Sequence, residues 1–115
     1  MKKTSKITIQ VGLDEGNVPE TITWQSEDGP NGDKPNDARG MLLSFFDGEA
    51  LETLKIDLWT KEMKVEEMDR FMFQTLRALA DTYYRATQNA QLASDMQRFV
   101  HYFGEKTEII PKTQE

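Results

Sequence analysis

The side chains that most often perform catalysis or bind metals are scarce in this sequence. The chain has 115 residues, with one histidine, His101, and no cysteine. A lone imidazole acts as a general base only beside a group that orients it, and zinc sites usually combine several histidines and cysteines. Because His101 lies at the edge of an apolar helical stripe, an exposed helix position is the simpler interpretation. Disulfides, iron–sulfur clusters and cysteine nucleophiles are excluded.

Carboxylates and amides are concentrated between residues 28 and 37, and oxygen-rich loops of this kind can bind calcium. Their spacing does not follow the EF-hand order, and the glycines and prolines among them are typical of ordinary turns. Glu66 and Glu67 are adjacent, so on a helix they point in different directions and do not form an acid–base pair. Ser44 lies outside any GxSxG motif. We therefore expect no catalytic, cofactor-binding or metal-binding residue.

Composition restricts the class of partner. The formal net charge is −6 and the isoelectric point is near 4.8, whereas nucleic-acid binding needs clustered Lys and Arg. No segment approaches the roughly 20 apolar residues of a membrane-spanning helix, and the N-terminal segment lacks the continuous apolar core of a signal peptide. We expect a single cytoplasmic, soluble domain over residues 1–115, frayed at 1–5 and 107–115, without nucleic acid or direct membrane insertion.

The chain is predicted to begin with a β-hairpin. Ile7, Ile9 and Val11 alternate with polar residues, which predicts a strand over residues 5–13. Ile22 and Trp24 alternate in the same way over residues 20–26. The short segment between them contains turn-forming Gly and Asn, which indicates an antiparallel connection.

A short helix and a third strand are expected next. Asn36 or Asp37 can cap a helix that ends at Gly48, and its apolar stripe contains Met41, Leu42, Phe45 and Phe46. Residues 52–61 then alternate between apolar and polar side chains, which predicts the best-defined strand of the chain.

The remaining sequence predicts two helices. From Val65 to about Arg85, apolar residues recur every three to four positions. A second helix follows Asn89 as its N-cap, and the short connection predicts a helical hairpin. The element order is strand, strand, helix, strand, helix, helix. It favours an α+β fold: a small, mostly antiparallel three-stranded sheet with the long helix and the C-terminal helical hairpin packed on one face.

Aromatic residues outside the predicted core are candidates for a partner surface. Phe73 and Tyr84 lie off the main apolar stripe of the long helix, and Trp59 falls on the polar face of its strand. Together with Trp24 they form the candidate set, because exposed aromatic side chains often anchor a partner. Ordinary core packing is the alternative, and the exposure of Trp59 distinguishes the two.

Several segments together resemble one protein family. They are VGLDEGNVPETITW at 11–24, MLLSFFD at 41–47, ETLKIDLWTK at 52–61, RAT at 85–87 and MQRFVHYFGEK at 96–106. From about Ile7 to Lys106 the chain is similar to the gliding motility protein GldC family of Bacteroidetes. The resemblance implies an accessory protein of the gliding machinery, and it transfers no catalytic or ligand residue.

Two classes of function follow from these observations. The first is a non-enzymatic interaction protein with an unidentified protein partner. The second is a small-ligand or metal-ion-binding domain, with a cavity between sheet and helices lined by some of the six Met and six Phe residues. An adaptable core explains the same composition. A homo-oligomer is compatible with both classes.

Overall fold

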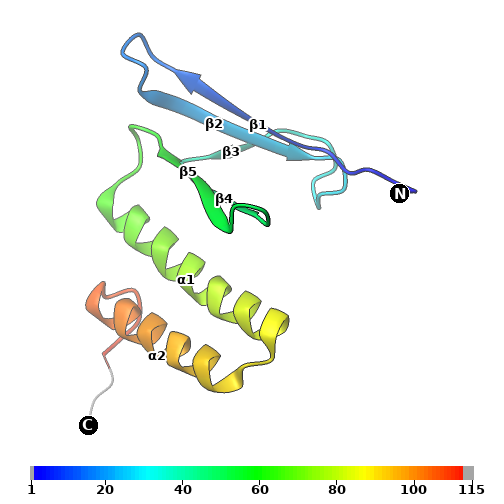
Figure 1. Cartoon of the computed structure of the whole chain (residues 1–115). Coiled ribbons are helices and arrows are strands. Elements are labelled where there is room, and N and C mark those ends of the chain that lie inside the picture. Colours follow the sequence, from blue (N-terminus) through cyan, green and yellow to red (C-terminus); the bar gives the residue numbers. More distant parts are fainter. Residues whose placement is uncertain (1, 113–115) are drawn as a thin grey trace. The chain divides into compact units, whose positions relative to one another are not determined.

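The computed structural model describes residues 2–112, which form five strands followed by two helices (Figure 1). They belong to two compact units: the strands lie in the unit that ends at Met63, and the helices lie in the unit that begins at Lys64. Antiparallel strands and helices occupy separate parts of the chain, so the predicted α+β class is confirmed. Neither described helix combines the length and hydrophobicity of a membrane-spanning segment.

The predicted N-terminal hairpin is confirmed, and a third short strand extends it. Ile9 lies opposite Trp24, and Val11 lies opposite Ile22. Ile22 also lies opposite Ala38 and is only 2% exposed, because apolar residues of both neighbouring strands flank it on one face. The antiparallel order is β1 (Ile7–Leu13), β2 (Pro19–Ser26) and β3 (Asn36–Ala38).

The helix predicted after Asp37 is wrong, because this segment forms strand β4 (Gly40–Asp47). A short apolar run such as residues 41–46 satisfies both a helical stripe and a strand, so its spacing does not decide between them. Pairing decides: β4 is opposed along its whole length by the following strand, from Gly40 opposite Trp59 to Asp47 opposite Glu52. Both expected helix caps lie in β3, where Asn36 is opposite Trp24 and Asp37 is opposite Thr23.

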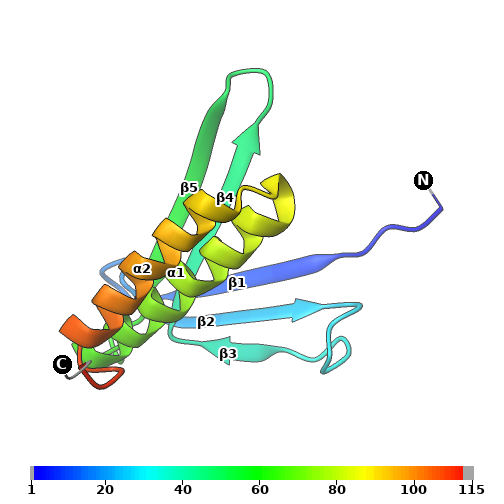
Figure 2. The same cartoon turned by 90° about the horizontal axis from the view of Figure 1, so that it is seen from below.

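The strand predicted at residues 52–61 is confirmed as β5 (Glu52–Trp59), but it pairs with β4 in a separate two-stranded sheet. We call this hairpin the β4–β5 ribbon; it appears apart from the three-stranded sheet in Figure 2. Its turn is closed by Asp47, whose Oδ1 accepts hydrogen bonds from the backbone N–H of Glu49 at 2.9 Å and of Ala50 at 3.3 Å. The third strand of the three-stranded sheet is therefore β3, and not the segment predicted from the sequence.

Both predicted helices are confirmed, as α1 (Val65–Thr87) and α2 (Ala90–Lys106). Glu67 Oε1 accepts a hydrogen bond from the Lys64 backbone N–H at 3.0 Å and places negative charge in the first turn of α1. Asn89 is the predicted cap of α2, and its Oδ1 accepts from the Leu92 backbone N–H at 3.0 Å.

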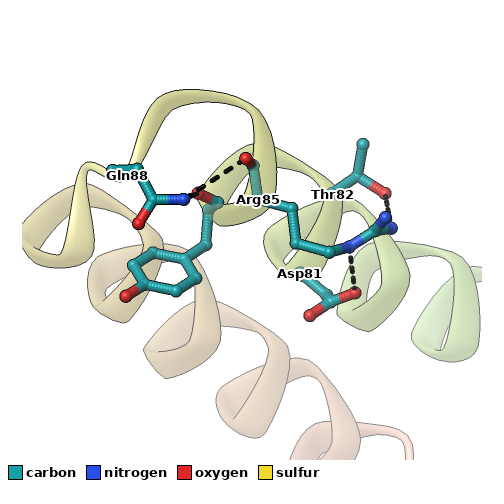
Figure 3. A network of polar contacts seen from close by, with 5 residues as sticks. Asp81, Thr82, Arg85 and Gln88 are labelled. Atoms are coloured by element: carbon teal, nitrogen blue, oxygen red, sulfur yellow. Dashed lines mark hydrogen bonds and ion pairs between the residues drawn. The ribbon is translucent and has the colours of Figure 1, made fainter.

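A polar network closes the C-terminal end of α1 (Figure 3). Arg85 Nε lies 3.0 Å from Asp81 Oδ2, and Arg85 Nη2 lies 3.4 Å from Thr82 Oγ1. The side-chain amide of Gln88 donates to the carbonyls of Tyr84 and Arg85 at 3.5 and 3.4 Å. The Tyr84 carbonyl also accepts from the Gln88 backbone N–H at 2.8 Å, so the side-chain amide mainly serves the Arg85 carbonyl in the last turn of the helix.

The two helices pack as the predicted hairpin around small residues. Phe73 and Ala80 of α1 are buried, as are Ala93, Val100 and Gly104 of α2. A Cβ added to Gly104 would lie 2.6 Å from Phe73 Cε1 and 2.9 Å from Ile110 Cγ1. The backbone N–H groups of Ile109 and Ile110 both donate to the Gly104 carbonyl, at 2.9 and 3.1 Å. Gly104 therefore permits close contact between α1, α2 and the segment after α2.

Candidate functional site

Three of the four aromatic residues predicted for a partner surface are exposed, and one is not. Trp24, Trp59 and Tyr84 are exposed, whereas Phe73 is only 7% exposed. The sequence interpretation that Phe73 lies off the buried stripe of its helix is incorrect, because its ring packs beside Gly104 of the second helix. Phe73 therefore offers almost no surface to a partner.

The structure shows that Trp59 is exposed, which the sequence alone does not decide. Trp59 is 56% exposed at the end of β5. It lies opposite Gly40 of β4, which has no side chain that could cover the indole. It shares its face of the ribbon with Lys55 and Asp57, because alternate residues of a strand point to the same side. Trp59 is thus an exposed aromatic residue on a mixed face, which also carries Leu42 and Phe46.

The opposite face of the β4–β5 ribbon is apolar throughout. In the observed register, Met41 lies opposite Leu58, Leu43 opposite Ile56, and Phe45 opposite Leu54. We call these six residues the apolar ribbon face. Exposure rises toward the turn, where Phe45 and Leu54 are 57% and 67% exposed, and Ile56 is 43% exposed. Leu51, within the turn, extends the apolar surface at this end.

Such a face is unfavourable in water unless something covers it. An isolated two-stranded hairpin is marginally stable, and contiguous exposed apolar surface typically marks an interaction site. Full removal from water of a side chain such as Phe45 or Leu54 is worth about 1.5–3 kcal/mol. The apolar ribbon face is therefore the candidate functional site of the described residues.

The sequence prediction does not contain this face because it assigns residues 41–46 to a helix. Residues 41–46 give no clear period, since Leu42 and Phe46 are as apolar as Met41, Leu43 and Phe45. The second row of the face, at residues 54, 56 and 58, is correctly predicted as one side of a strand. Only the pairing of β4 with β5 unites the two rows.

An open hollow of about 360 Å³ lies where β3 bends into β4. Arg39 occupies the bend, and its carbonyl accepts a hydrogen bond from the Thr60 backbone N–H at 2.8 Å. Thr60 is 3% exposed, and its hydroxyl finds no hydrogen-bond partner among the described residues. The charged residues of the lining are Glu20, Asp37, Arg39 and Glu62. Residues 2–112 contain no group of three or more His, Cys, Asp or Glu side chains suited to hold a metal ion.

A charged pair near this hollow ties the β1–β2 turn to the end of β5. Lys61 Nζ lies 2.5 Å from Asp14 Oδ2 and 3.7 Å from a carboxylate oxygen of Glu20. The Lys61 ammonium, together with the Val18 backbone N–H, holds the pKa of the Asp14 carboxyl below its ordinary value. In turn, the Asp14 carboxylate raises the pKa of Lys61.

His101 lies on α2, as predicted, with an exposed side chain. Its Nε2 is 3.4 Å from Glu105 Oε1, one helical turn further along. This contact fits an ordinary surface pair on a helix, which is the interpretation that the sequence favours.

A model of the family described as gliding motility-associated, GldC-like proteins matches residues 19–109. The chain belongs to this family. The match begins at β2 and ends just beyond α2, so it includes the whole β4–β5 ribbon and both helices of this GldC-like chain. No curated protein and no solved structure matches the chain. The resemblance found in the sequence segments is thereby confirmed, and it connects the chain with gliding motility.

Proposed function

We propose that this GldC-like chain acts in gliding motility as a non-enzymatic accessory protein, and that it binds a protein partner in the cytoplasm through the apolar ribbon face. The observation that carries the proposal is the exposure of this face, on which three neighbouring side chains of β4 and β5 are more than two-fifths uncovered: Phe45 57%, Leu54 67% and Ile56 43%.

Two further features support an interaction role. Proteins commonly bind each other through a central cluster of large apolar side chains surrounded by polar residues. Phe45 and Leu54 lie opposite each other on the two strands and supply such an apolar centre. The family description concerns a cellular process and not a reaction, which also fits an accessory protein.

Neighbouring phenylalanines of β4 provide a matched test. Phe45 and Phe46 are both exposed, at 57% and 67%, but lie on opposite faces of the ribbon. Phe45→Ser removes an aromatic side chain from the apolar ribbon face, and Phe46→Ser removes one from the opposite face. The encoding organism should be assayed with each variant in place of the wild-type gene, for surface spreading and for proteins that co-purify with the tagged chain.

We expect Phe46→Ser to retain both the spreading and the co-purified partner, and Phe45→Ser to lose both. Circular dichroism should confirm that the two variants fold equally, because both side chains are exposed. Equal behaviour of the two variants in either assay would contradict the proposed face. Retention of spreading and of the partner by Phe45→Ser would contradict it as well.

A further inference from the structure

We propose that two copies of the chain pair antiparallel along the outer edge of β5, so that their β4–β5 ribbons form one four-stranded sheet centred on Ile56. This inference goes beyond the proposed function, because it concerns self-association through a strand edge and not the binding of another protein to the apolar ribbon face.

The first observation is an open strand edge. Within residues 2–112, β5 has β4 as its only strand neighbour, and residues 52–58 make no backbone hydrogen bond outside the ribbon. The side chains along β5 are exposed from Glu52 to Asp57. An edge of this length presents N–H and C=O groups that a second strand can pair with. Natural proteins often protect such edges with proline, a bulge or a charged side chain such as Lys. β5 contains no proline and its register with β4 is regular, so Lys55 and Asp57 are the charges that a second strand must accommodate.

The second observation is the symmetry of the β5 sequence about Ile56. When two identical strands pair antiparallel with Ile56 opposite its own copy, Leu54 lies opposite Leu58 of the second copy. Lys55 then lies opposite Asp57 of the second copy, and this charge pair occurs twice. The strand is therefore complementary to itself in both its apolar and its charged rows.

Other registers lack this complementarity. The apolar side chains of the two copies lie on the same face only in registers that place each of them opposite a residue of the same row of the second strand. Centring the pair on Lys55 brings the two lysines opposite each other, and centring it on Asp57 does the same with two carboxylates. Centring on Leu58 places Lys55 opposite Lys61 of the second copy. Charge thus selects the register centred on Ile56.

The present arrangement of the two charges is compatible with this pairing. Lys55 Nζ and Asp57 Oδ2 lie 3.2 Å apart on one strand, and both side chains are about half exposed, at 58% and 47%. They are already on the same face and near the middle of β5. In the dimer each would gain a second opposite charge across the edge. The apolar ribbon faces of the two copies would also join, and four strands are more stable than an isolated hairpin of two.

Charge reversal gives the decisive test. Lys55→Glu places two carboxylates opposite each other at both contacts, and Asp57→Lys places two ammonium groups there. We expect each single variant to raise the dimer dissociation constant about tenfold or more relative to wild type, measured by analytical ultracentrifugation.

Mixing the two variants should restore the dimer. In a heterodimer of Lys55→Glu with Asp57→Lys, the introduced carboxylate faces the introduced ammonium group at one contact, and the native Lys55 and Asp57 face each other at the other contact. An equimolar mixture should therefore dimerise more tightly than either variant alone. Glu49→Lys, in the turn, adds positive charge as Asp57→Lys does and is the control, which should dimerise like wild type.

A thiol placed on the twofold axis gives a second test. The chain contains no cysteine, so Ile56→Cys introduces a single thiol directly opposite its own copy. Opposite residues of antiparallel strands have Cα atoms about 4.5–5.5 Å apart, within the range that a disulfide spans. Thr53→Cys is the control, because its two copies would be about 20 Å apart in this register. We expect Ile56→Cys to form the covalent dimer on mild oxidation and Thr53→Cys to remain monomeric.

Three results would overturn the proposal. They are a wild-type chain with the 13.3 kDa monomer mass at all concentrations, a dimer that both charge variants leave unchanged, and equal crosslinking of the two cysteine variants. Restoration in the mixture shows that a loss of dimer in the single variants is not a folding defect. Partner capture by the Phe45 and Phe46 variants is read separately, so failure of the proposed function does not affect this test.

Discussion

At the scale of single residues, Asp14 has the most distinctive surroundings among the titratable side chains. Its Oδ1 accepts hydrogen bonds from the backbone N–H groups of Gly16 at 2.8 Å and Val18 at 2.9 Å, while its Oδ2 contacts Lys61. All three contacts favour the ionised carboxylate, which explains its lowered pKa. Folding is thereby linked to the protonation of this group.

Acid should weaken the contribution of Asp14 to stability. Because its pKa is lower when folded, the stabilisation is complete above the ordinary carboxyl range and is lost as the pH falls through the folded pKa. Asp14→Asn keeps the acceptor oxygen for the turn but removes the charge. We expect wild type to melt higher than this variant at about pH 6, and the difference to shrink toward about pH 2. Circular dichroism melts across this range measure it.

The pKa of Asp28 is also lowered. Because Asp28 is present in both the wild type and the Asp14→Asn variant, the difference between their melting temperatures isolates the contribution of Asp14. A constant difference in melting temperature across the whole pH range would contradict the linkage. Wild type and variant should also be compared in high salt, since screening reduces the attraction between exposed charges.

Residues also show where sequence reasoning reaches its limit. The position of Trp59 on the Lys55 and Asp57 side of its strand follows from simple alternation, although its exposure does not, and the N-cap role of Asn89 follows from residue type and position. The burial of Phe73 does not follow in this way, because helical register alone does not reveal which neighbour faces a side chain. The deciding feature is Gly104, 31 positions later, whose missing side chain makes room for the ring. No local pattern contains that information.

At the scale of elements, the long periodic segments are predictable and the short apolar segment is not. The two helices and strands β1, β2 and β5 follow from periodicities sustained over seven or more residues. Residues 41–46 contain large apolar side chains on both sides, so neither a helical nor a strand period stands out. Pairing with β5 determines their structure. The candidate site depends on that pairing, and for this reason the sequence does not reveal its residues as a set.

The turn of the β4–β5 ribbon contains an unfavourable residue. Leu51 has φ 59°, a left-handed conformation that costs about 1 kcal/mol for a residue with a Cβ, and its side chain is 72% exposed. Asn tolerates this conformation better, whereas β-branched Val tolerates it less. We expect Leu51→Asn to stabilise the chain by about 0.5–1 kcal/mol and Leu51→Val to destabilise it by a similar amount. Urea unfolding measures both.

The two substitutions at Leu51 serve as controls for each other, because both remove exposed apolar surface and only one suits the backbone. Equal stability of the Asn and Val variants would show that backbone strain at this position is negligible. A stabilised Leu51→Asn variant that still binds the partner would also restrict the functional surface to the six residues of the apolar ribbon face.

At the scale of the whole molecule, burial is unevenly distributed. The helical hairpin contains the buried residues Phe73, Ala80, Ala93 and Val100, and the three-stranded sheet contains Ile22. Every residue of β4 and β5 is half-buried or exposed. Segments with few buried contacts open more readily, so the ribbon should be the least protected regular structure of the described chain.

Hydrogen exchange tests both this ordering and the proposed dimer. At low concentration, we expect backbone amides of β4 and β5 to exchange faster than those near Phe73 and Val100, since the ribbon lacks buried side chains. At high concentration, pairing along β5 should slow exchange in the ribbon and leave the helical amides unchanged. Asp57→Lys should exchange rapidly in the ribbon at both concentrations. A ribbon as protected as the helices in dilute wild type would contradict the ordering, and protection that rises in the helices alone would place the contact between copies elsewhere.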